Sequence, residues 1–233
     1  MSGHSKWATT KRQKAVVDAK RGAIFTKIGN QIAIAARSGT DPITNSTLAM
    51  ILEKARQANM PKANIERALQ RVADKSATTL IEETYEAYGP GGIGIIIEVA
   101  TDNKNRTMPV VRHTLEKNGG RMADPGSVMF QFARKGVIFT PAKGDEIIMQ
   151  ALDSGAEDIA EETDGTTIYT AASDLAKVRK SLLESNFQID SAELQYVPTT
   201  TIQVEDTTSE KVEKILDSLD DLDDVTAVHT NAA

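Results

Sequence analysis

The spacing of the apolar residues changes from about four to about two after a polar segment at residues 73–81. A chain with both periods needs a helical part and a part that contains strands. Before that segment, apolar side chains recur three and four residues apart, as on one face of a helix. They predict helices at about 18–37, 45–59 and from 61 onwards. Because isolated helices this short are marginal in water, we expect them to pack as a three-helix bundle.

The second half of the chain predicts a ferredoxin-like domain. Its elements follow the order strand, helix, strand, strand, helix, strand, and the two middle strands meet at the hairpin signal Asp164-Gly165. The strands are predicted at 137–140, 158–163, 167–171 and 189–197, and the helices at 145–154 and 173–185.

Two strand–helix–strand units flank this segment. The first has strands at 93–100 and 128–132 around a helix at 106–118, and the second has strands at 200–204 and 225–230 around a helix at 208–219. Joined, they complete a second ferredoxin-like unit. We therefore predict an α+β fold with three domains: 1–75, 76–133 plus 198–233, and 134–197 inserted in the second. The alternative is a single large antiparallel sheet.

The charge is divided unevenly along the chain. The net charge is +9 over residues 1–75 and −15 over residues 76–233, which together give −6. A basic N-terminal part on an acidic protein points to contact with a polyanion. The predicted nucleic-acid-binding cations lie in the first 37 residues: Lys6, Lys11, Arg12, Lys14, Lys20, Arg21, Lys27 and Arg37.

No constellation of catalytic or metal-ligating residues emerges. The chain has no cysteine, its histidines lack helical ligand spacing, and the glycine-rich segment 89–94 precedes a strand and lacks a phosphate-loop lysine. We expect no enzyme activity, no cofactor and no metal. No apolar run reaches the ~20 residues that span a bilayer, and the N-terminus lacks a signal-peptide core, so a cytoplasmic protein is expected.

A second candidate surface lies where the strand ending near residue 100 passes into a helix. Its residues are Asn103, Lys104, Asn105, Arg106 and Arg112. A helix N-terminus with nearby cations suits an anion such as a phosphate, or a partner. The competing interpretation is that Asp102 or Asn103 only caps the helix.

A string of motifs along nearly the whole chain resembles the YebC family. The motifs are Gly3-His4-Ser5-Lys6-Trp7, Asp18-Ala19-Lys20-Arg21-Gly22, Asn59-Met60-Pro61-Lys62, the segment from Tyr85 to Gly92, Thr101-Asp102-Asn103, Asn105-Arg106-Thr107 and Gly126-Ser127-Val128. The resemblance implies a helical domain plus two α+β domains, one inserted in the other. It also implies a cytoplasmic, DNA-binding transcriptional regulator, while related mitochondrial proteins activate translation of cytochrome oxidase.

Two non-enzymatic functions remain open from the sequence. The first is a DNA-binding regulator of transcription, although no glycine turn of a helix-turn-helix motif is recognisable, so base-specific readout is not expected. The second is a translation factor that contacts ribosomal or transfer RNA, because a basic arm beside ferredoxin-like sheets suits shaped RNA too. The target sequence and the oligomeric state are not encoded in any recognisable motif.

Overall fold

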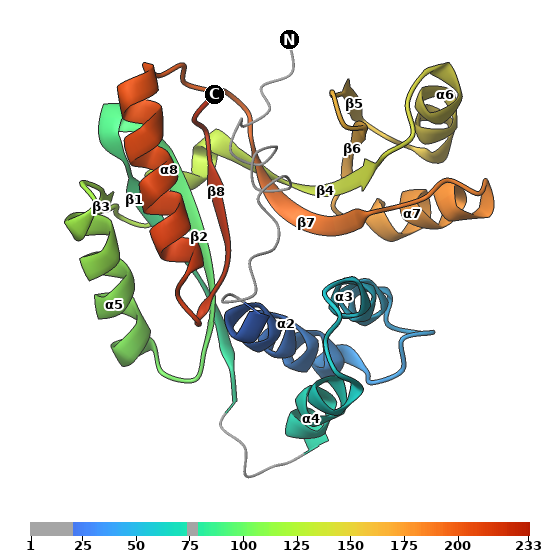
Figure 1. The fold of residues 1–233 in the computed structure, drawn as a ribbon, viewed down its shortest axis with the longest axis horizontal. Coiled ribbons are helices and arrows are strands. Elements are labelled where there is room, and N and C mark those ends of the chain that lie inside the picture. Colours follow the sequence, from blue (N-terminus) through green and yellow to red (C-terminus); the bar gives the residue numbers. More distant parts are fainter. Residues whose placement is uncertain (1–20, 74–78) are drawn as a thin grey trace. The chain divides into compact units, whose positions relative to one another are not determined.

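The computed structural model describes residues 21–73 and 79–233, and these form two compact units (Figure 1). One unit is the continuous segment Ala133–Val197, and the other contains the described residues before Ala133 and the segment Pro198–Ala233. Residues 1–20, which include the start of the first predicted helix at Asp18, lie outside the described residues. The α+β fold is confirmed, with one α+β domain inserted in another. The finer division into three domains at the stated boundaries stays a prediction.

The N-terminal part is the expected three-helix bundle. Helix α2 spans Arg21–Ala35 and continues as the 3-10 turn η2, Ala36–Ser38; α3 spans Ser46–Gln57 and α4 spans Lys62–Ala73. Helix α2 packs against both α3 and α4. Its apolar face and theirs share one core, which includes Ile28, Ile32, Leu48, Leu52, Ala55, Met60 and Ala68.

One buried asparagine joins two helices of the bundle. The Asn45 side-chain oxygen accepts the Leu48 N–H at 3.0 Å, which caps the N-terminus of α3. Its amide group donates to the Ala35 and Gly39 carbonyls, both at 2.8 Å. Gly39 has φ of 136°, a value that side chains disfavour, and this lets the chain leave η2 towards Asn45.

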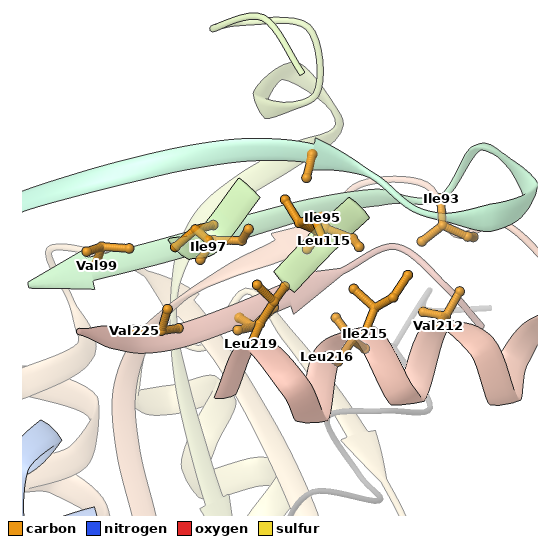
Figure 2. Packing of buried hydrophobic residues seen from close by; sticks show 13 residues of the cluster. Ile93, Ile95, Ile97, Val99, Leu115, Val212, Ile215, Leu216, Leu219 and Val225 are labelled. Atoms are coloured by element: carbon orange, nitrogen blue, oxygen red, sulfur yellow. The ribbon is translucent and has the colours of Figure 1, made fainter. Parts of the chain in front are cut away.

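The first four-stranded sheet has the order β3-β1-β2-β8, and its strand pairs are antiparallel. Its strands are β1 (Ile81–Tyr88), β2 (Gly94–Thr101), β3 (Arg121–Met122) and β8 (Val225–Thr230). Helices α5 (Lys104–Lys117) and α8 (Asp206–Asp220) cover one face. Figure 2 shows the core between them, where Ile95 and Ile97 of β2 meet Leu115, Ile215 and Leu219 of the helices.

Two strand predictions for this sheet are wrong, and two of its strands, β1 and β3, were not predicted. Strand β1 was not predicted, because its sequence contains three glutamates and lacks the apolar run that marks a buried strand. The expected strand at 128–132 is instead the 3-10 turn η4, Met129–Gln131, followed by the start of β4 at Phe132. The expected strand at 200–204 is reduced to the single bridge Ile202↔Ala232. Strands β1 and β3 take the two places in the sheet that those segments were expected to fill.

The inserted unit has the predicted ferredoxin-like order. Strand β4 (Phe132–Thr140), α6 (Asp145–Ser154), β5 (Asp158–Glu161), β6 (Thr166–Ala171), α7 (Leu175–Glu184) and β7 (Ser191–Pro198) follow one another along the chain. The sheet order is β5-β6-β4-β7. Because the two sheets share no strand pairing, the alternative of a single large sheet is wrong.

The two sheets match strand for strand. In each, the strand before the first helix (β2 or β4) lies beside the last strand (β8 or β7), and the next strand after that helix (β3 or β5) lies at the far edge. They differ in the remaining strand, since β6 follows β5 in the chain whereas β1 precedes β2. Both domains thus have the ferredoxin-like arrangement, reached by different chain connections.

Candidate nucleic-acid interface

The structure describes the side chains of only some of the predicted nucleic-acid-binding cations. Lys6, Lys11, Arg12, Lys14 and Lys20 lie outside the described residues, and for Arg21 the structure describes the backbone at the start of α2. Lys27 and Arg37 are the two predicted cations whose side chains are described, and each has a partner within the protein.

Lys27 binds the C-terminal end of α8. Its ammonium donates to the Asp220 carbonyl oxygen and lies 3.3 Å from Asp220 Oδ1, and its side chain is 12% exposed. The last carbonyls of a helix lack helical partners and form its negative dipole end, so a lysine there is favourable. In this arrangement Lys27 stabilises the contact of α2 with α8 and presents little surface to a phosphate.

Arg37 is exposed and has one described contact with the chain. It follows α2 in the turn η2, and its Nη2 donates to the carbonyl of Leu80, the residue before β1. A guanidinium has five N–H donors in a planar fork. Arg37 therefore helps fix the start of the first sheet and keeps donors for another acceptor.

Helix α4 presents two arginines that sequence reasoning did not select. Arg67 and Arg71 are exposed, four residues apart, and their side chains contact neutral amides: Arg67 Nη1 lies 3.5 Å from Asn64 Oδ1, and Arg71 Nη1 lies 3.2 Å from Asn30 Oδ1. An amide oxygen orients a guanidinium without cancelling its charge. Both arginines fall between the apolar positions of α4, and such positions of a helix face solvent. The apolar spacing in the sequence could therefore have identified them as exposed cations.

The bundle carries further cations on α3 and α4. Lys54 and Arg56 are exposed near the end of α3, and Lys62 begins α4, where it forms an exposed ion pair with Glu66 at 3.6 Å. Residues 21–73 contain eight basic and three acidic residues. The bundle is therefore a net cationic surface independently of the arm.

The connection between α3 and α4 is a tight four-residue turn. Asn59 has φ of 55°, in the left-handed region where glycine is the commonest residue. Met60 is buried and donates its N–H to the Ala55 carbonyl at 2.9 Å, and Pro61 precedes the first turn of α4. The glycine turn that the sequence lacked is supplied here by Asn59. The sequence predicted both helices and the short connection between them, and the structure adds the left-handed residue on which that connection turns.

The second predicted surface, at the start of α5, has the geometry of a helix cap. Asn103 Oδ1 accepts the Arg106 N–H at 3.2 Å, as the capping interpretation expected. Arg106 Nη2 lies 2.9 Å from Asp102 Oδ1 and 3.1 Å from Asp224 Oδ2, and Lys104 pairs with Glu83. The hydrogen bond that the Arg106 guanidinium donates to the Asp224 carboxylate raises the pKa of Arg106.

Three carboxylates therefore face Lys104 and Arg106. Asp224 also accepts the Thr107 hydroxyl at 2.5 Å, so it ties the start of α5 to the start of β8. Asn105 and Arg112 are exposed on α5. An incoming anion would have to compete with carboxylates for Lys104 and Arg106, and the surface favours a structural role over phosphate binding.

The remaining candidate chemistry is sparse in the described part of the chain. His229 of β8 is buried beside Glu98 of β2, with Nε2 3.3 Å from Oε1, whereas His113 is exposed on α5. Within residues 21–73 and 79–233, no group of three or more metal-ligating side chains comes together. Over the same residues, none of the helices combines the length and apolar character that crossing a membrane requires.

Comparisons with known proteins cover nearly the whole chain. A family model described as the TACO1/YebC protein N-terminal domain matches residues 5–75, and one described as the TACO1/YebC second and third domain matches residues 80–232. A protein of Moorella thermoacetica named "Probable transcriptional regulatory protein" is 47% identical over 100% of this chain and 95% of its own length. One of the same name from Acidothermus cellulolyticus is 44% identical, covering 99% and 96%.

A solved structure has the same fold. The crystal structure of a conserved hypothetical protein from Aquifex aeolicus superposes with a TM-score of 0.88 at 37% identity, covering 94% of this chain and 93% of that one.

Proposed function

Given that the chain belongs to the TACO1/YebC family, we propose that it is a regulator of gene expression that binds nucleic acid through its N-terminal bundle and the basic segment before it. Relatives at 44–47% identity carry the name of probable transcriptional regulators, which supports duplex DNA as the first target to test. The role is non-enzymatic, and it needs only a cationic surface that reaches a polyanion.

The observation that carries this proposal is the pair Arg67 and Arg71 on α4. Both side chains are exposed and held by neutral amides, so their charge is available to phosphates. Arginine suits this task because its planar fork binds phosphate oxygens in pairs. Because residues 76–233 carry a net charge of −15, the N-terminal part supplies the main long-range attraction for the polyanion.

The test is a salt titration of duplex DNA binding by fluorescence anisotropy with the full chain. Each phosphate contact releases counterions, so the logarithm of the affinity falls with the logarithm of salt by about 0.9 per contact. The double variant Arg67→Gln, Arg71→Gln should weaken binding by roughly 10- to 100-fold at about 0.1 M salt and reduce the slope by about 2.

The matched control is Lys177→Gln, Lys180→Gln on α7, which makes the same change in net charge on the inserted unit. It should leave the slope unchanged. Equal losses for the two double variants would show a general charge effect and contradict a bundle interface. Repeating the titration with ribosomes and with transfer RNA tests the alternative of a translation factor, which predicts tighter binding to those RNAs than to duplex DNA at every salt concentration.

A further inference from the structure

Phe130 is a large aromatic side chain that the first sheet domain leaves in solvent. It is 74% exposed in the 3-10 turn η4, and it is the aromatic member of the exposed large apolar side chains among the described residues. A single exposed apolar residue is common and assigns no function by itself. The turn that carries it, however, is held unusually firmly.

A buried carboxylate fixes the backbone just before Phe130. Glu86 of β1 is 7% exposed, and its two oxygens accept the N–H groups of Gly126 at 2.5 Å, Val128 at 2.6 Å and Met129 at 2.8 Å. Burying a charge is costly unless it is fully hydrogen-bonded, and here three backbone donors stabilise it. Two motifs, 85–92 and 126–128, thus meet to set the shape of this turn.

Both sides of Phe130 are anchored. Before it, Val128 is fully buried against Gly94, where an added Cβ would lie 2.8 Å from Val128 Cγ1. After it, Gln131 Oε1 accepts the Asn231 amide at 2.7 Å, and the Gln131 carbonyl accepts the Thr199 N–H at 2.8 Å. The ring is exposed while its backbone is fixed, which lowers the entropy cost of binding a ligand.

The same corner carries an exposed arginine. The Tyr88 hydroxyl donates to the Ser127 carbonyl at 2.8 Å, which ties Tyr88 to the turn, and the Arg121 guanidinium lies 4.8 Å from the centre of the Tyr88 ring. A guanidinium over an aromatic ring is held flat and retains its charge. A fixed aromatic ring and a stacked arginine are the two side-chain types that bind unpaired bases and their backbone.

We propose that Phe130 stacks on an unpaired nucleobase of the bound nucleic acid, with Arg121 providing positive charge at the same corner. This inference rests on the proposed function and adds a ligand class to it. Bases inside a duplex are already stacked on their neighbours, so the Phe130 corner selects single-stranded segments, loops or displaced bases. The cationic bundle contributes sequence-independent attraction, and the corner contributes discrimination between paired and unpaired strands.

The experiment measures binding of the full chain to labelled single-stranded RNA, single-stranded DNA and duplex DNA by anisotropy. Phe130→Ala should weaken binding of the single strands by about 5- to 150-fold, the range of one aromatic–base stack, and leave duplex binding unchanged. Phe130→Trp should retain single-strand affinity, whereas Phe130→Leu should lose it, because leucine is apolar but offers no ring. Thermal melts should be unaltered, since the side chain is 74% exposed.

An exposed apolar residue outside the proposed interface serves as the control. Met149→Ala in the inserted unit, at a residue 64% exposed, should bind single strands like the wild type. Wild-type affinity in Phe130→Ala, or full affinity in Phe130→Leu, would overturn the stacking inference and leave the proposed function standing. If the wild type bound none of the three nucleic acids, the proposed function itself would be wrong.

Discussion

The arginines of α4 and the arginine at the start of α5 belong to one compact unit but have opposite kinds of partner. Arg67 and Arg71 contact asparagine oxygens, whereas Arg106 contacts the carboxylates of Asp102 and Asp224. A neutral amide leaves the positive charge available, and a carboxylate cancels most of it. The comparison teaches that the number of cations on a surface does not identify an interface; the partners of those cations do.

Removal of Asp224 should have the largest effect on stability among the changes that distinguish the start of α5 from the arginines of α4. Asp224→Ala takes one of the acceptors from the hydroxyl of the buried residue Thr107 and leaves Arg106 with Asp102 alone. We expect the free energy of unfolding to fall by about 2 kcal/mol, as for other losses of a partly buried hydrogen-bonded carboxylate. Urea denaturation measures this value.

Asp224→Asn is the control for that prediction, because it keeps an acceptor for the hydroxyl and removes the charge. It should recover part of the lost stability. If the Asp224→Ala variant were as stable as the wild type, the carboxylates at the start of α5 would contribute no more than surface charges. The structural role assigned to this surface, in contrast to α4, would then be wrong.

A smaller effect is expected at Lys27 of α2, a predicted nucleic-acid-binding residue whose ammonium contacts the C-terminal end of α8. Lys27→Gln removes the cation from the C-terminal end of α8 and should lower the free energy of unfolding by about 1 kcal/mol, with unchanged slope in the salt titration of duplex DNA. Arg71→Gln should do the reverse, with unchanged stability and a reduced slope. If Lys27→Gln reduced the slope as Arg71→Gln does, Lys27 would belong to the interface after all.

The smallest effect concerns Tyr85, beside the carboxylates at the start of α5. Burial, and secondarily Glu83, raise the pKa of the Tyr85 phenol above its usual 10.0. The folded state then holds this proton to higher pH than the unfolded state, so the contribution to stability is complete below about pH 10 and is lost as pH rises through the folded pKa. Thermal melts between about pH 9 and 11 should show a steeper fall for the wild type than for Tyr85→Phe. Parallel curves would contradict the shift.

Local pattern predicted most of the elements, and its failures have a physical cause. The bundle and the inserted ferredoxin-like unit follow from apolar spacing and turn residues, which act within a few positions along the chain. Strand β1 was not predicted, because Glu86 has the character of a surface residue in the sequence. In the structure Glu86 is buried, and its carboxylate accepts three backbone N–H groups from a loop 40 to 43 residues away. Residues 128–132 suggested a strand by alternation, but their first N–H groups are taken by that same carboxylate.

The sequence predicted that the N-terminal part is basic, but it did not identify which cations of that part are exposed. Charge asymmetry alone indicated a basic N-terminal part, and that holds for the described bundle as well as for the sequence before it. Lys27 was predicted to bind nucleic acid and its ammonium contacts the end of α8, while Arg67 and Arg71 were not among the predicted residues. Phe130 was not selected either, because an aromatic residue in an apparent strand is expected to be buried.

By itself, the sequence determined the family, the types of secondary structure and the sign of the charge on each part, because these depend on composition and on short-range spacing. Only the tertiary structure decided which cations remain available and which aromatic ring stays in solvent. Asp220, the partner of Lys27, lies 193 residues away along the chain, and Asp224 lies 118 residues from Arg106. Electrostatic pairing acts through space over a few ångströms, so a cation's role is set by the residues that folding brings beside it.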